Sequence, residues 1–163
     1  MLAGHLADVN HAVFHPNGAY ALSGSQDGTL RLWDVSSASC IRLFNGHTAP
    51  VRAVAISHDG TTAASAAEDR TVRLWHLASG RQLKALPAKE AGACAVTFSH
   101  SGRLLASASE RHVHVWEVRD LMTTQEASVP PALSLPSPVP LMNAAFAPGQ
   151  AMLIASGADE RDP

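Results

Sequence analysis

The sequence predicts an all-β fold built from repeated four-stranded antiparallel units, and two observations lead to this prediction. The first is an internal repeat with a period of 42 residues, in which Gly4-His5 recurs as Gly46-His47 and Trp33 recurs as Trp75. The second is a series of short apolar runs separated by Asn-Gly and Asp-Gly pairs, which tolerate the backbone conformation of tight hairpin turns. Together they predict strands that fold back on one another within each repeat.

The expected strands follow in the same order in both of the first two units. The stretch VNHAVFHPNGAYALSGS predicts two strands around Asn17-Gly18, LRLWDV the third strand and CIRLFNG the fourth. The second unit repeats this plan, with VRAVAISHDGTTAASAA around Asp59-Gly60, then VRLWHL and QLKALPA. Because tight turns join antiparallel neighbours, we expect one antiparallel sheet per unit.

A repeat of this length, with Gly-His near one end and Trp-Asp at the other, resembles the WD repeat. The resemblance implies a WD-repeat β-propeller, in which four-stranded sheets, here called blades, are arranged around a central axis. In this family a His, a Ser of the second strand, an Asp of the next turn and the Trp of the third strand form a hydrogen-bonded network inside the blade. The resemblance assigns this network to His5, Ser23, Asp27 and Trp33 in the first unit and to His47, Ser65, Asp69 and Trp75 in the second.

The same side chains have a competing interpretation, since Ser, His and Asp also form hydrolytic triads. An active site would not be copied twice in register with a tryptophan attached, so the repetition favours a structural role. A carboxylate that accepts from an imidazole, which in turn meets a hydroxyl, satisfies polar groups that a blade must bury. We therefore predict a protein without catalytic activity.

The third unit keeps Trp116 but departs from the pattern elsewhere. Lys89 stands where a histidine is due, and Glu110 replaces the aspartate six residues before the tryptophan. A partly made polar network is a weak stabiliser. We expect this blade to be looser than the first two.

His112 and His114 alternate before Trp116, and two imidazoles on one face of a strand could bind a metal ion. Aligned on the tryptophan, they take the places of Thr and Arg in the first two units. A tetrahedral zinc ion needs a third protein ligand, and only Glu110 or the distant Cys94 is available. We predict ordinary third-strand residues here, with no metal site, cofactor or small-molecule substrate.

The chain divides into three parts. Three WD-repeat units cover residues 1–119 (about 4–45, 46–87 and 88–119), a Pro/Ser-rich insertion covers 120–141, and 142–163 resembles the first two strands of a further, incomplete unit. We expect the insertion to be exposed, partly as polyproline II, and to replace or precede an outer strand. In the last part, Ser156 and Glu160 have the spacing of Ser23 and Asp27.

About three and a half blades form only part of a ring, which we expect to have seven. Closure protects the strand edges of a propeller, usually with about four to eight blades. The outer strand that should precede Gly4-His5 is missing. We therefore expect the chain to be the C-terminal part of a longer protein.

The composition excludes several classes of function. The 163 residues carry a net charge of −2, and the 12 Lys and Arg residues are scattered, which disfavours direct binding to nucleic acid. No apolar run approaches the roughly 18 to 20 residues that span a bilayer, and the first residues lack the features of a signal peptide. We expect an intracellular protein in which Cys40 and Cys94 are small apolar fillers.

Residues 2–87 resemble, more narrowly, the WD-repeat subunits of the transcription factor TFIID and of SAGA-type coactivators. The shared features are Gly4-His5-Leu6 with Asp8-Val9, the Phe14-His15-Pro16-Asn17 turn, and Arg42-Leu43-Phe44 ahead of Gly46-His47. This resemblance implies a nuclear scaffold that contacts histone-fold subunits and supports initiation by RNA polymerase II. The alternative is another WD-repeat adaptor, such as a ubiquitin-ligase substrate receptor, a histone-peptide reader or a signalling scaffold.

One face of the expected propeller offers candidate contacts for partners. The loops from outer to inner strand and from second to third strand share this face, and such loops often carry binding residues. The candidates are Asp8, Asn10, Gln26, Pro50, Arg52 and Glu68. For each one alone, plain exposure to solvent is the competing interpretation.

Overall fold

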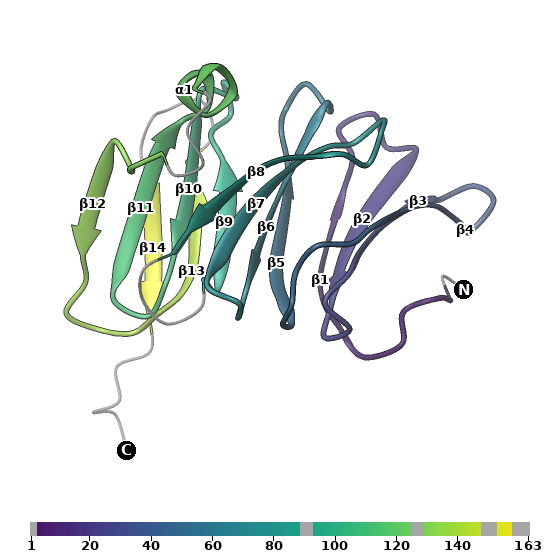
Figure 1. The fold of residues 1–163 in the computed structure, drawn as a ribbon, viewed down its shortest axis with the longest axis horizontal. Coiled ribbons are helices and arrows are strands. Elements are labelled where there is room, and N and C mark those ends of the chain that lie inside the picture. The colour runs from purple at the N-terminus through teal and green to yellow at the C-terminus, as the bar shows by residue number, and fades with distance from the viewer. Residues whose placement is uncertain (1–2, 89–92, 125–128, 148–152, 158–163) are drawn as a thin grey trace.

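The computed structural model describes residues 3–88, 93–124, 129–147 and 153–157. Within these ranges the strands form four antiparallel sheets that stand side by side (Figure 1). A short helix, α1 (Val118–Thr123), follows the third sheet's third strand. No helix in the described ranges is long and apolar enough to span a membrane. The predicted all-β fold of four-stranded antiparallel sheets is confirmed.

The first two sheets have the same plan, with each strand paired to the next one in the chain. The first sheet consists of β1 (Val9–Phe14), β2 (Tyr20–Ser25), β3 (Leu30–Asp34) and β4 (Ser39–Phe44). The second sheet consists of β5 (Val51–Ile56), β6 (Thr62–Ala67), β7 (Thr71–His76) and β8 (Gln82–Pro87). Ser23 lies opposite Arg31, and Ser65 lies opposite Arg73, so the two sheets also share their register.

Tight turns connect the first and second strands, and their geometry depends on glycine. Gly18 and Gly60 have φ angles of 72° and 73°, in the left-handed region that favours glycine. The amide of Gly18 donates to the carbonyl of His15 at 2.8 Å, and that of Gly60 donates to Ser57 at 2.9 Å. Each hairpin is thereby closed at the same position of its repeat.

The sheets contact one another through their innermost strands. β1 packs beside β5, β5 beside β9 (Ala95–Phe98), and β9 beside β13 (Leu141–Phe146). The apolar core lies between adjacent sheets, as in the cluster that joins Leu22 and Leu30 to Val51 and Val54. All six residues of β6 are buried, and its sequence TAASAA shows why: small side chains leave room for a sheet on either face.

The third sheet takes its outer strand from the Pro/Ser-rich segment. Its strands are β9, β10 (Leu104–Ala108), β11 (His112–Glu117) and β12 (Leu133–Pro136). In the β11–β12 ladder Val113 lies opposite Leu135. The outer strand therefore lies within the segment 120–141, outside the predicted third unit of about 88–119.

A two-stranded sheet completes the described fold. β13 and β14 (Leu153–Gly157) pair antiparallel, and β13 lies beside both β9 and β10. Buried Leu141 and Ala144 join the core of the third sheet. These two strands occupy the inner half of a further blade.

Candidate functional site

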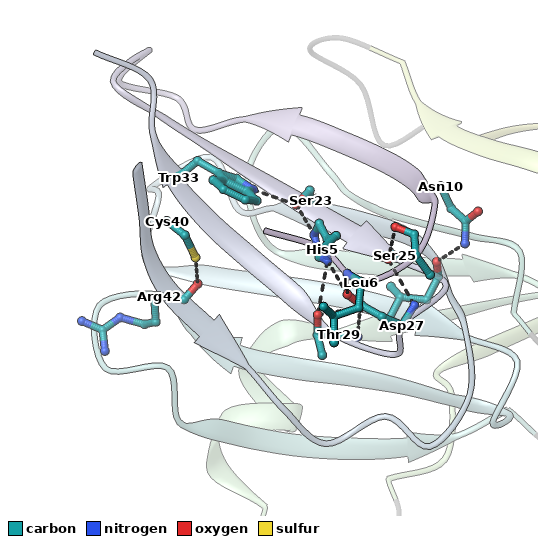
Figure 2. A network of polar contacts seen from close by, with 12 residues as sticks. His5, Leu6, Asn10, Ser23, Ser25, Asp27, Thr29, Trp33, Cys40 and Arg42 are labelled. Carbon is teal, nitrogen blue, oxygen red and sulfur yellow. Dashed lines mark hydrogen bonds and ion pairs between the residues drawn. The ribbon is translucent and has the colours of Figure 1, made fainter. Parts of the chain in front are cut away.

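A chain of polar side chains runs through the interior of the first sheet (Figure 2). His5, which precedes β1, lies between Asp27 of the β2–β3 turn and Ser23 of β2. Its Nδ1 is 2.9 Å from Asp27 Oδ2, and its Nε2 is 2.7 Å from Ser23 Oγ. The indole Nε1 of Trp33, in β3, donates to the same hydroxyl oxygen at 2.8 Å. The structure thus brings together the four residues that the sequence grouped.

The proton positions in this hydrogen-bonded network follow from its two end groups, the Asp27 carboxylate and the Trp33 indole. An ionised carboxylate only accepts, so the contact with Asp27 places a proton on His5 Nδ1. In the neutral imidazole Nε2 then accepts from the hydroxyl of Ser23. The indole of Trp33 can only donate, so it uses the acceptor side of that hydroxyl. Ser23 is 5% exposed. This buried hydroxyl joins His5 to Trp33 inside the sheet.

The second sheet repeats the chain with nearly equal geometry. His47 Nδ1 lies 2.8 Å from Asp69 Oδ2, and its Nε2 lies 2.7 Å from Ser65 Oγ. Trp75 Nε1 donates to Ser65 Oγ at 2.9 Å. Arg73 adds a more distant ion pair, with 3.6 Å between its guanidinium and Asp69 Oδ2. Ser65 is fully buried.

The carboxylates of these networks are stabilised in their charged form. Burial of Asp27 disfavours the charge, but hydrogen bonds from the Thr29 hydroxyl, the Leu6 amide and His5 outweigh it, so the pKa of Asp27 lies well below its usual 3.8. Burial opposes the charge of Asp69 too, and hydrogen bonds from Thr71 and His47 again outweigh it and lower the pKa of Asp69.

The imidazole of the second network is held neutral. Burial lowers the pKa of His47 below its usual 6.5, and this effect exceeds the opposing attraction of Asp69. A neutral imidazole with its proton on Nδ1 donates to the carboxylate and accepts from the hydroxyl of Ser65. Each hydrogen bond of the second network thereby has one donor and one acceptor.

The third sheet contains only a remnant of this network. Ser107, the counterpart of Ser23, is 1% exposed, and its hydroxyl has no hydrogen-bond partner among the described residues. Trp116 Nε1 donates instead to the carbonyl of Val129 at 3.2 Å. Glu110 is exposed, and position 89, where the sequence lacks the histidine, lies outside the described residues.

The fourth unit contains an alanine where the network needs its serine. In the first sheet Ala12 lies opposite Ser23, one residue after a bulge, and in β13 the equivalent residue, Ala144, lies opposite Ala155. Ser156, which the spacing had equated with Ser23, is one position further along the strand. The assignment of Ser156 was wrong because the bulge in β13 sets the pairing register of β13 with β14, and this register places Ala155 at the position of Ser23. Glu160 lies outside the described residues.

The candidate partner contacts lie in pairs at one end of the first two sheets. The amide of Gln26 donates to the carbonyl of Asp8 at 2.9 Å, and that of Glu68 donates to Pro50 at 3.0 Å. Asp8, Gln26 and Glu68 are exposed, whereas Pro50 is half-buried. Three candidates thus present polar side chains to solvent at equivalent loops.

The two remaining candidates, Asn10 and Arg52, have different roles in the structure. Asn10 Nδ2 donates to the carbonyl of Val51 in the next sheet at 2.8 Å, so this side chain joins two blades. Arg52 is exposed and pairs with Glu68, with 2.7 Å between Nε and Oε1. Both residues lie on strands, Asn10 in β1 and Arg52 in β5, and not in the loops where they were predicted, and of the two only Arg52 is exposed.

Histidines outside the network make further contacts between blades, which the sequence did not predict. His15 Nε2 lies 3.0 Å from the carbonyl oxygen of Gly60 in the next sheet. The amide of Val54 donates to His11 Nδ1 at 3.3 Å. The sequence offers only a weak signal, since both histidines belong to the first unit alone.

His112 and His114 lie on β11 at the places of Thr and Arg in the earlier third strands. Their rings are parallel within 7°, with 5.9 Å between the ring centres. Cys94 contacts the carbonyls of Ala108 and Leu141. Burial raises the pKa of the Cys94 thiol, so it remains protonated. Across the described ranges, no three His, Cys, Asp or Glu side chains converge on one point.

Known proteins share this repeat and this fold. The family described as "WD domain, G-beta repeat" matches residues 1–34, 38–76 and 80–117, and each match ends at the last residue of a third strand. Pre-mRNA-processing factor 19 of Bos taurus is 43% identical over 42 residues, and striatin of Homo sapiens is 42% identical over 43. Each alignment covers 26% of this chain and 8% or 6% of the relative.

Solved structures match almost the whole chain. The structure of U3-55K has a TM-score of 0.86, and the crystal structure of RRP9 WD40 repeats has one of 0.85. Both are 21% identical to this chain and match 96% of it, and the chain spans 47% of each. At this identity the likeness concerns the fold alone. The three family matches cover more than half of the sequence, and the chain therefore belongs to the WD40-repeat family.

Proposed function

We propose that the protein is a non-catalytic scaffold that binds other proteins through the exposed loops at one end of its sheets. One observation carries the proposal: the polar residues that repeat from sheet to sheet are buried and bonded to one another inside the blades. They stabilise the sheets, which leaves the exposed loops that contain Asp8, Gln26 and Glu68 for recognition, together with Arg52 at the start of β5.

The narrower form of the proposal is a nuclear subunit of a TFIID- or SAGA-type complex. It is supported by the sequence features of residues 2–87, and it assigns histone-fold subunits as partners and transcription initiation by RNA polymerase II as the process. The alternative is a WD-repeat adaptor of another assembly, and the matches to pre-mRNA-processing factor 19 and striatin support such a wider range.

Affinity purification with a charge change at the candidate face tests the scaffold role. The double variant Gln26→Arg with Glu68→Arg alters two exposed residues at equivalent loops. The matched control, Ala19→Arg with Ala78→Arg, adds the same residues to exposed turns at the opposite end of the sheets. Quantitative mass spectrometry of the bound proteins compares both with the unaltered protein.

We expect the first variant to lose its partners and the control to keep them. Equal recovery with both would contradict the assigned face. Recovered histone-fold subunits would support the narrower form, whereas ubiquitin-ligase or signalling components would support the alternative. Nuclear or cytoplasmic staining of the tagged protein separates the two classes further.

A further inference from the structure

Two exposed histidines from neighbouring sheets lie against each other at the end opposite the candidate partner face. His58 is in the β5–β6 turn and His100 in the β9–β10 turn, and both side chains are exposed. Their ring centres are 4.6 Å apart, and the ring planes are tilted by 49°. They occupy equivalent positions of consecutive repeats, two residues before Gly60 and Gly102. Side-by-side packing of β5 and β9 therefore places the two imidazoles together.

This spacing fits two imidazoles that share one metal ion. With metal–nitrogen bonds of about 2.0–2.1 Å, two adjacent imidazole ligands have ring centres roughly 4.5 Å apart at the 90° angle of a square-planar or octahedral ion and roughly 5.2 Å apart at a tetrahedral ion. The rings of His112 and His114 are 5.9 Å apart and nearly parallel, as expected of neighbours on one strand face. The geometry therefore favours the pair that joins two blades over the pair within one strand.

The turn that contains His58 is fixed by its own hydrogen bonds. Asp59 Oδ1 accepts from Ser57 Oγ at 2.6 Å and from the amide of Thr61 at 3.0 Å. A rigid turn keeps its imidazole in place at little entropic cost.

We propose that His58 and His100 form a two-histidine site for a divalent transition-metal ion of the kind that imidazole prefers: nickel, copper or zinc. The described residues offer no third His, Cys, Asp or Glu to this pair. Water completes the coordination of the exposed ion. Since the two ligands come from different sheets, the bound ion joins the second blade to the third.

Nickel(II) titration of the purified chain by isothermal calorimetry tests this site. We expect one nickel ion per chain, and a loss in affinity on the order of 100-fold in His58→Gln and in His100→Gln, because each variant leaves a single imidazole. The matched control is His76→Gln, a histidine of the second sheet whose ring bonds to Ser79. It should bind nickel like the unaltered chain.

Thermal unfolding provides a second measurement. A ligand that binds only the folded state raises the melting temperature, so nickel should stabilise the unaltered chain and the His76 variant but neither site variant. Equal melting temperatures of all variants without nickel would show that they fold. The proposal is overturned if the unaltered chain binds no nickel, if both site variants bind it normally, or if His112→Gln with His114→Gln abolishes binding.

Discussion

The indole Nε1 of Trp116 donates a hydrogen bond at 3.2 Å to the carbonyl oxygen of Val129, which lies outside the four strands of its sheet. The equivalent indoles of Trp33 and Trp75 donate to a serine hydroxyl inside their own sheets. The hydroxyl of Ser107, which would be the third acceptor, is buried without a partner in the described chain. In the third sheet the carbonyl of Val129 thus takes the acceptor role that a serine hydroxyl has in the first two sheets.

Removal of a serine hydroxyl should reduce the free energy of unfolding in the second sheet but not in the third. Ser65→Ala leaves Trp75 Nε1 and His47 Nε2 buried without a partner, so we expect a loss of about 1–3 kcal/mol in the free energy of unfolding. Ser107→Ala removes a hydroxyl that bonds to no described residue, so its effect should be near zero or stabilising. Urea unfolding followed by tryptophan fluorescence measures both. Equal losses would contradict the difference between the two networks.

The free energy of unfolding should decrease in two steps as the pH is lowered. The pKa of His47 is lowered by folding, so below pH 6.5 the unfolded chain binds its proton first, and stability declines until the folded imidazole also protonates. The pKa values of Asp27 and Asp69 are lowered as well, so a second loss begins below their unfolded value of 3.8. Above pH 6.5 neither step contributes.

Urea unfolding at a series of pH values tests this dependence. In Asp69→Asn the acid step should shrink, because one of the carboxylates whose pKa is lowered by folding is gone. A stability that rises as the pH falls from 6.5 would contradict the neutral state of His47.

The contact between the first two blades should depend on Asn10 more than on Arg52, its counterpart in the second unit. Asn10→Ala removes the hydrogen bond to Val51 and should cost about 1 kcal/mol. Arg52→Ala removes only an exposed ion pair, for which we expect less than about 0.5 kcal/mol. Differential scanning calorimetry of both variants decides the order, and a larger effect of Arg52→Ala would refute it.

Gly24 should not tolerate even a methyl group. A Cβ at this position would lie 2.6 Å from Val51 Cγ1 and 2.9 Å from Val54 Cγ1, so Gly24→Ala should cost about 1–3 kcal/mol. Ala66 and Ala108 occupy the equivalent places in the next sheets, which makes the change look harmless in the sequence.

A double variant identifies the cause of that loss. If the clash with Val51 dominates, Gly24→Ala combined with Val51→Ala should cost less than the sum of the two single changes. Thermal unfolding of the three variants measures this coupling. Strict additivity would show that the loss does not come from the clash with Val51.

The fold and the inner networks could be predicted because they repeat. Ser65 and Trp75 are recognisable because Ser23 and Trp33 stand 42 residues earlier, and equal spacing on equal strands brings the same side chains together. The third network could be expected to fail for the same reason, since Glu110 breaks the pattern.

Contacts between sheets could not be predicted in this way. Asn10 reaches Val51, and His15 reaches Gly60, because neighbouring sheets pack at a particular distance and twist. No property of a single strand encodes that arrangement. The outer strand at 133–136 escaped prediction because its pairing with β11 outweighs a proline-rich sequence.

The position of β12 in the chain has a consequence for the order of folding. Strands β3 and β4 are separated by residues 35–38, and β7 and β8 by residues 77–81, but β11 and β12 are separated by residues 118–132. Closing a longer loop costs more chain entropy, although each doubling of its length adds only about 0.6 kcal/mol. We therefore expect the outer strand of the third sheet to dock later than β4 and β8, and the link before it to tolerate added residues at little cost in stability.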